Sequence, residues 1–283
     1  MSELLDALLD PWRSGITTRA FAEVMLLGAI CGPLGFWVLG YRLSYGVESL
    51  SHALLPGLVV ATIAGVAPLA GGAIAAVVAA GLIALAARAE RVGADTATAV
   101  VVTGLVGLGA LLAFAPETPK SIGALLFGDP LAVSDGDLLA AALLVPIGGG
   151  LLTALHRPLS AALFDSLGAP SLGVRPDRVR LALLLLVAAA VCVSVQGLGS
   201  LLALALFVGP PLAVGRRARS ATGALLASAA VGIAGGLGGI YASYHLDLAA
   251  GASVALALCA AAAVGALVGA IWRPAAGVRA ATT

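Results

Sequence analysis

Long stretches without a formal charge alternate with short polar segments along almost the whole chain. Each apolar stretch is long enough for one or two helices across a hydrocarbon core of about 30 Å. We therefore predict an all-α fold, a polytopic membrane helix bundle with eight or nine transmembrane helices. The predicted spans lie in the stretches Val24–Leu39, Ser49–Ala87, Thr96–Ala115, Leu138–Leu155, Leu181–Gly215, Ser220–Tyr244 and Leu248–Trp272.

The composition supports a membrane protein and excludes several other classes. Of the 283 residues, 61% are hydrophobic and only 10% are charged, and the mean hydropathy is +1.10. No polar stretch is long enough to build a soluble core, so residues 1–283 are predicted to form one transmembrane domain. Residues 1–22 lack a cleavage-site pattern and are predicted to be an interfacial segment. The net charge of +1, with no basic patch, argues against nucleic-acid binding.

The distribution of basic residues predicts how the chain lies in the cell membrane. Most arginines fall in the segments after residue 40, after residue 87, at 156–180, at 216–219 and beyond 272. If these segments are cytoplasmic, only Arg13, Arg19 and Lys120 lie outside. This positive-inside bias favours nine spans with a cytoplasmic carboxyl terminus and an external amino terminus.

Glu48 and His52 stand out as ionisable residues within an apolar region. On a helix, residues four apart project from one face, and ionisable groups at membrane depth are candidates for function. Carboxylate oxygen and imidazole nitrogen suit Zn²⁺, Mn²⁺ and Fe²⁺, whereas copper(I) would favour sulfur ligands. Pro56 lacks the N–H that would bond the His52 carbonyl, so if the helix continues through this point, that oxygen is left free to face a cavity, a water or the ion.

Two features of this pair remain open at this stage. One Glu and one His form an incomplete ligand shell, and a two-fold dimer would supply a second pair across its axis. The alternative is that Glu48 and His52 only hydrogen-bond each other or a neighbouring helix and fix the packing.

His245 and Asp247, in a predicted external turn, are second candidates for metal entry or for docking a binding protein. The alternative for these two residues is a solvated loop.

Other motifs describe packing and coupling rather than catalysis. Gly232 with Gly236, and Gly235 with Gly239, form overlapping small-xxx-small patterns that allow helices to approach closely. Residues 156–180 contain several Gly and Pro residues and predict a broken cytoplasmic elbow. The sequence contains no H-E-x-x-H, no G-x-S-x-G and no phosphate-binding G-x-x-x-x-G-K-[ST]. We therefore expect no enzyme activity on this chain.

The sequence resembles the permease subunits of ABC importers for zinc, manganese and chelated iron. The likeness extends from about Leu26 to Trp272. It rests on five segments in the same order: a Gly46-to-Gly57 motif containing Glu48, Ser51, His52 and Pro56, an external loop at 125–138, an elbow at 163–174, a small-residue span at 198–220 and a last hairpin at 238–256. Glu48 departs from the usual Asp, Gly168 and Pro170 replace helix formers, and Pro211 stands where many relatives have Ala.

The resemblance implies a homodimeric core for ATP-driven import of a divalent transition metal, zinc or manganese, that passes Glu48 and His52. It also implies a cytoplasmic ABC ATPase that binds ATP and docks on Phe164, Asp165, Leu172 and Gly173, an extracytoplasmic metal-binding protein, and no permanently bound cofactor. Two alternatives are a secondary ion-coupled metal transporter, which would need no ATPase, and a siderophore or cobalamin permease, which would not need the Glu48 and His52 pair.

Overall fold

Helices form all the regular structure in the described part of the chain, so the predicted all-α fold is confirmed. The computed structural model describes residues 10–86, 94–114, 131, 133–218 and 220–271. In chain order the elements are α2 (Gly15–Gly40), α3 (Ser44–Ala53), α4 (Leu55–Ile63), α5 (Pro68–Ala86), α6 (Ala94–Ala113), α8 (Asp135–Phe164), η2 (Ala169–Leu172), α9 (Pro176–Leu198), α10 (Ser200–Val214), η3 (Gly215–Arg217), α11 (Ala221–Leu246) and α12 (Ala250–Ile271).

Seven segments of the described chain are long and apolar enough to cross a membrane. One of them, Ser44–Ile63, consists of the two short helices α3 and α4. Two shorter apolar helices, Pro68–Ile83 and Ser200–Val214, add to these spans. Together they account for the eight or nine transmembrane helices predicted from the sequence.

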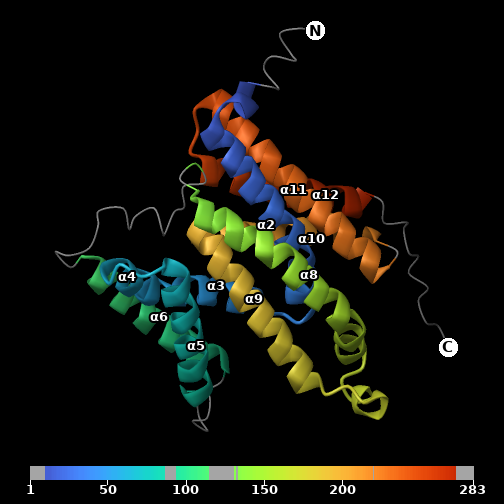
Figure 1. Cartoon of the computed structure of the whole chain (residues 1–283). Helices are drawn as coiled ribbons and strands as arrows, with labels where there is room; N and C mark the ends of the chain where they lie inside the picture. Colours follow the sequence, from blue (N-terminus) through green and yellow to red (C-terminus); the bar gives the residue numbers. More distant parts are fainter. Residues whose placement is uncertain (1–9, 87–93, 115–130, 132, 219, 272–283) are drawn as a thin grey trace.

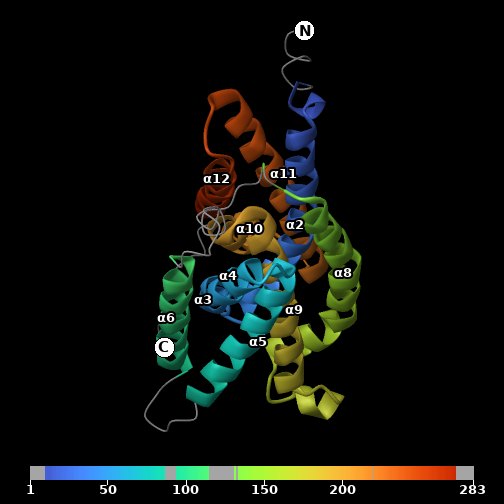
Figure 2. The same ribbon diagram turned by 60° about the vertical axis from the view of Figure 1, so that its left-hand side comes forward.

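Helix α2 lies at the centre of the bundle and packs against α8, α9, α10 and α11 (Figure 1). Its side chains Phe21, Leu27 and Trp37 are fully buried, as is Phe207 of α10. Helices α4, α5 and α6 pack on one another in a second group beside this core (Figure 2). By contrast, Val77 and Leu111 on α5 and α6 are at least 70% exposed, as expected for surfaces that face lipid or another subunit.

The glycine patterns of α11 contact two different helices, α2 and α12. A Cβ on Gly232 would lie 2.7 Å from the carbonyl oxygen of Gly28 in α2, and one on Gly236 would collide with Val24. A Cβ on Gly235 would instead lie 2.6 Å from the Leu258 side chain in α12. The small residues predicted to allow close packing therefore hold α2 on one side of α11 and α12 on the other.

Some predicted boundaries differ from the structure. The first span begins at Gly15 rather than Val24, so the later part of the predicted interfacial segment belongs to α2. The elbow is shorter than residues 156–180, because α8 continues through Pro158 to Phe164. An internal proline removes one helix hydrogen bond, and burial of Leu159 and Ala162 holds this last part of α8 in place. Residues 125–130 and 132 of the predicted external loop lie outside the described residues, as do residues 1–9, 115–124 and 272–283.

Candidate metal path and coupling elbow

Helix α3 carries the predicted pair, and it is a short helix inside a broken span. The break falls at Leu54, which ends α3 and precedes α4. Pro56 lies in the first turn of α4, where a missing N–H costs nothing. Helix α3 contacts α5, α6, α9 and α10 and lies between the two groups of helices (Figures 1 and 2). The sequence thus places Glu48 and His52 on an element surrounded by several spans.

Glu48 and His52 lie on one turn of α3, and neither is sealed inside the single chain. Glu48 is exposed and His52 is half-buried, whereas the intervening Ser49 and Ser51 are buried. The Ser51 hydroxyl donates to the Val47 carbonyl at 2.9 Å, so this hydroxyl is used within its own helix. His52 lies in the last turn of α3, where the negative end of the helix dipole favours a positive charge. The accessible face of α3 therefore offers an acid and an imidazole to a cation.

A free His52 carbonyl required a helix that continues through Pro56, and the structure contradicts this hypothesis. Backbone N–H groups at the end of α3 donate to the carbonyl oxygens of His52 and Leu50. The chain tightens at Leu54 instead of continuing as a regular helix, and this supplies a donor that Pro56 cannot. The side chains, rather than this oxygen, remain the candidate ligands.

The pair alone does not complete a metal shell. The described residues contain no group of three or more His, Cys, Asp or Glu side chains that could hold an ion. A tetrahedral or octahedral ion would need additional oxygen or nitrogen donors. In a single chain, this arrangement offers two ligands from one helix face.

His245 and Asp247 lie at another end of the bundle. His245 belongs to the last turn of α11, and Asp247 caps that helix with φ +50°. The His245 ring lies 6.3 Å from the Tyr241 ring and 5.3 Å from the Tyr244 ring. Because Tyr241 accepts a hydrogen bond from the Trp12 indole, this turn lies beside the start of the α2 region and away from α3 (Figure 1). The structure thus keeps the two candidate pairs apart.

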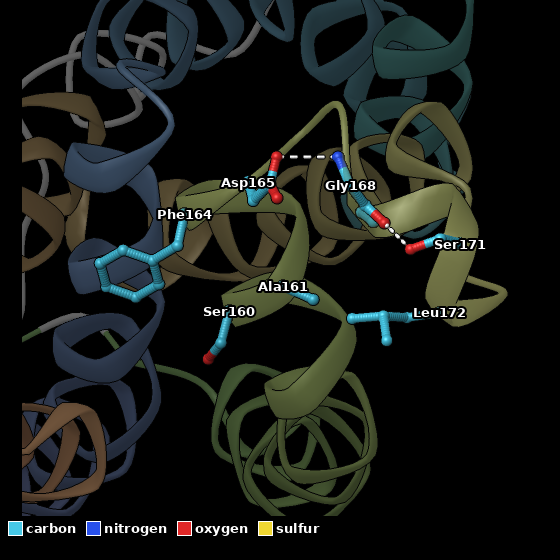
Figure 3. A pocket seen from close by; sticks show the side chains of 8 residues that line it. Ser160, Ala161, Phe164, Asp165, Gly168, Ser171 and Leu172 are labelled. Atoms are coloured by element: carbon cyan, nitrogen blue, oxygen red, sulfur yellow. Dashed lines mark hydrogen bonds between the residues drawn. The ribbon is translucent and has the colours of Figure 1, made fainter.

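The predicted coupling residues gather around the elbow between α8 and α9. Phe164, Asp165 and Leu172 line a hollow of about 410 Å³, shared with Ser160, Ala161, Gly168, Ala169 and Ser171 (Figure 3). Asp165 accepts a hydrogen bond from the Gly168 N–H at 2.8 Å, and the Ser171 hydroxyl donates to the Gly168 carbonyl at 2.6 Å. These bonds give the elbow a defined shape.

The elbow also displays apolar side chains outside the helix bundle. Phe164 is 84% exposed, Leu167 93% and Leu172 74%. Gly173 ends η2 with φ +75°, a left-handed conformation that favours glycine. A polar-rimmed cluster of this kind is typical of a protein-binding surface.

The sequence analysis missed Glu23, which is the buried acid of the described chain. Its side chain is 0% exposed and lies on α2, close to the end of α9. Glu23 directly precedes the predicted first span, so it does not stand out as an intramembrane acid in the hydropathy pattern. Glu23 is the only acid among the 26 residues of α2, and an acid on a spanning helix was the available signal.

Comparisons with known proteins agree with this arrangement. A model of the ABC 3 transport family matches residues 14–269. The manganese transport system membrane protein MntC of Halalkalibacterium halodurans is 30% identical, over 84% of this chain and 82% of its own length. A probable iron transport system membrane protein of Haemophilus influenzae is 28% identical, over 89% of this chain and 93% of its own. The chelated iron transport system membrane protein YfeC of Yersinia pestis is 25% identical, with 88% and 84% covered.

Two solved structures share the fold. PsaBC from Streptococcus pneumoniae, solved in complex with a Fab, matches with a TM-score of 0.85 at 21% identity and covers 93% of this chain and 95% of that one. An inward-facing structure of a putative metal-chelate type ABC transporter matches with a TM-score of 0.67 at 16% identity and covers 90% and 84%. The arrangement of helices described above is therefore that of an ABC importer permease.

Proposed function

The chain belongs to the ABC 3 transport family, and on that premise we propose that two copies form the path for a divalent transition-metal ion, with zinc or manganese as cargo. As a member of this family it is a multi-pass permease subunit of the plasma membrane, and ATP is hydrolysed on a separate subunit. Membership of an ABC family argues against the alternative of a secondary transporter, because ATP drives ABC transporters. The relatives named for manganese and for iron support a metal as the cargo.

The observation that carries the proposal is the accessible acid and imidazole on α3. A charged Glu48 facing lipid would be costly, so its open face needs water, an ion or a partner. Carboxylate and imidazole are ligands for divalent first-row metals, including zinc and manganese. The cation would bind Glu48 and His52 transiently, at a depth between the two faces of the membrane.

A second copy would complete the coordination. Two-fold symmetry presents the same helix face twice, so two Glu48 and two His52 side chains would meet across the axis. Four such ligands match the number that zinc takes in a tetrahedral site. The exposed apolar side chains of α6, such as Val100 and Leu111, are available for burial by lipid or by the second copy.

The elbow is proposed to receive the ATPase. Exposed Phe164 and Leu172 would enter an apolar pocket of that subunit, while Asp165 and Gly173 hold the shape of the turn. Because α8 ends and α9 begins at this elbow, a displacement of the elbow moves two spans together. We expect Leu172→Asp to leave the permease folded but to reduce co-purification of the ATPase at least tenfold, with the same change at an exposed leucine of the other turn, Leu248→Asp, as the control. Unchanged co-purification would reject this surface.

The opposite face is proposed to receive a metal-binding protein. His245 and Asp247 are exposed on the turn between α11 and α12, at the end of the bundle that carries the start of α2. Their position suits a docking contact or a first contact with the ion.

Uptake of metal supplied as the free ion, by the permease reconstituted with its ATPase and the metal-binding protein, tests the path. We expect Glu48→Gln and His52→Gln each to reduce uptake of free Mn²⁺ or Zn²⁺ at least about tenfold, since each removes a ligand. Glu48→Asp, which retains a carboxylate, and Tyr45→Phe, on the same helix, are the matched controls. Normal uptake in both Gln variants would refute the site. Transport of only chelated metal would favour the chelate alternative.

A further inference from the structure

Glu23 is an acid that the proposed metal path does not use. It lies on α2, which packs against α8, α9, α10 and α11. Its side chain is fully buried, and neither Oε1 nor Oε2 has a hydrogen-bond partner among the described residues. A charged carboxylate in this setting would lose its hydration without any compensation.

The carboxyl group occupies a niche that exists because residue 197 is glycine. A Cβ on Gly197 would collide with Oε1 of Glu23 and would lie 3.1 Å from its Cδ. Gly197 is next to the last residue of α9, and Gly199 follows with φ +83° before α10 begins. The acid is therefore closed in by the turn between α9 and α10.

No described cation neutralises Glu23. Arg19, one turn away on α2, forms an ion pair with Asp135 of α8 at 2.6 Å. Asp137, also on α8, is itself an acid and supplies no positive charge. The Cys31 thiol, further along α2, is paired with Ser194 of α9 at 3.4 Å.

The remaining neighbouring elements supply no strong counter-charge. Helix α10 has no titratable residue, and the charged residues of α9, Asp177, Arg178 and Arg180, lie at its other end. The titratable groups on the facing part of α11 are Tyr241, Tyr244 and His245, and those on α3 are Tyr45, Glu48 and His52. A metal ion would need more donors than this niche offers, because the described residues contain no group of three metal-binding side chains. A proton is the one cation that a single enclosed carboxyl group can hold.

We propose that Glu23 is a proton-binding site whose release is coupled to opening of the turn between α9 and α10. With the turn closed, as in this structure, the carboxyl group is neutral. When the turn moves away, water enters, the O–H bond of the acid breaks and the proton passes to that water. The carboxylate is then hydrated, which holds the turn open. The inference goes beyond metal transport and does not depend on the Glu48 and His52 path.

Infrared difference spectroscopy of the purified permease tests the protonation directly. At neutral pH we expect a protonated-carboxyl band that is lost in Glu23→Gln and retained in Glu48→Gln. Gly197→Ala places a methyl group where the Glu23 carboxyl group lies and should also remove the band. This second variant tests the proposal without changing Glu23 itself. A protonated band that persists in Glu23→Gln, or no such band in the wild type, would overturn the proposal.

Cysteine labelling tests the coupling. Ser200 is 6% exposed at the start of α10, so in a Cys259→Ser background a Ser200→Cys thiol reacts with maleimide only when the turn opens. At each pH, the labelling rate of Ser200→Cys with Glu23 intact is divided by the rate of Ser200→Cys with Glu23→Gln. Ionisation of the thiol affects both rates equally and therefore cancels in this ratio. We expect this ratio to rise with pH by up to about tenfold per unit, as release of one proton requires. A ratio that does not change with pH would show a static acid and would reject the coupling.

Discussion

Tyr41, the residue that follows α2, joins two spans through one hydroxyl group. Its Oη donates to the Leu159 carbonyl of α8 at 2.9 Å. Burial raises the pKa of the Tyr41 phenol, and the positive charge of Arg180 works in the opposite direction. The phenol is thus held in the neutral form that donates the bond.

We expect Tyr41→Phe to lower the free energy of unfolding by about 0.5–1 kcal/mol, because the bond is lost at a half-buried position. Since the folded-state pKa is raised, the contribution of Tyr41 is complete below about pH 10 and is lost as pH rises through the raised pKa. Thermal unfolding in detergent between pH 7 and 11 measures both effects. Tyr45→Phe, at an exposed tyrosine, is the control. Identical curves for Tyr41→Phe and the wild type would contradict the prediction.

The sequence predicted some residue-level features and not others. The shared face of Glu48 and His52 followed from their spacing, because a helix fixes which side chains lie together. The His52 carbonyl could not be predicted in the same way, since its partner depends on how the chain tightens at Leu54. The isolation of Glu23 depends on Gly197, far away in the sequence, and on Arg19 being paired with Asp135. Such tertiary neighbours leave no local pattern.

At the scale of elements, α11 shows how small residues decide helix packing. Gly232 and Gly238 lie on the same helix, but only Gly232 meets another backbone, that of Gly28 in α2. A Cβ on Gly238 would have no atom within 4 Å. The two positions therefore form a matched pair.

We expect Gly232→Ala to destabilise the permease by about 1–3 kcal/mol, the usual cost of overpacking, because neither backbone can give way easily. Gly238→Ala should be neutral or slightly stabilising, since alanine is the better helix former. Comparing the two melting temperatures in the same detergent checks this. Equal losses in both variants would mean that the contact between α2 and α11 is not tight.

The number and type of the elements could be predicted better than their ends. Hydropathy located the spans because each crossing must bury its own backbone hydrogen bonds. It placed the start of α2 too late, since Arg19 and Glu23 interrupt the apolar pattern although both belong to the helix. It ended α8 too early, because Pro158 and the polar residues near it look like a loop while Leu159 is buried.

At the scale of the whole molecule, the basic residues predict which face is cytoplasmic. The elbow between α8 and α9 should lie inside, and the turn between α11 and α12 outside. Leu167 in the elbow is 93% exposed and Leu248 in the turn is 50% exposed, so cysteines at these positions are accessible to reagents.

We expect Leu248→Cys to react with a membrane-impermeant maleimide in intact cells, and Leu167→Cys to react only after the membrane is permeabilised. The Cys259→Ser variant is the background, since Cys259 is exposed while Cys31 and Cys192 are buried. The opposite labelling pattern would reverse the assigned orientation, and with it the faces given to the ATPase and the binding protein.

The alternating contacts of α11 also limit how the length of this helix can change. Gly232 and Gly236 meet α2, while Gly235 and Gly239 meet α12. Deleting one residue just before Gly235 would rotate everything after it by about 100° and bring bulky side chains to both seams. We therefore expect an insertion or a deletion within α11 to disrupt the permease, whereas substitutions on its exposed side should be tolerated.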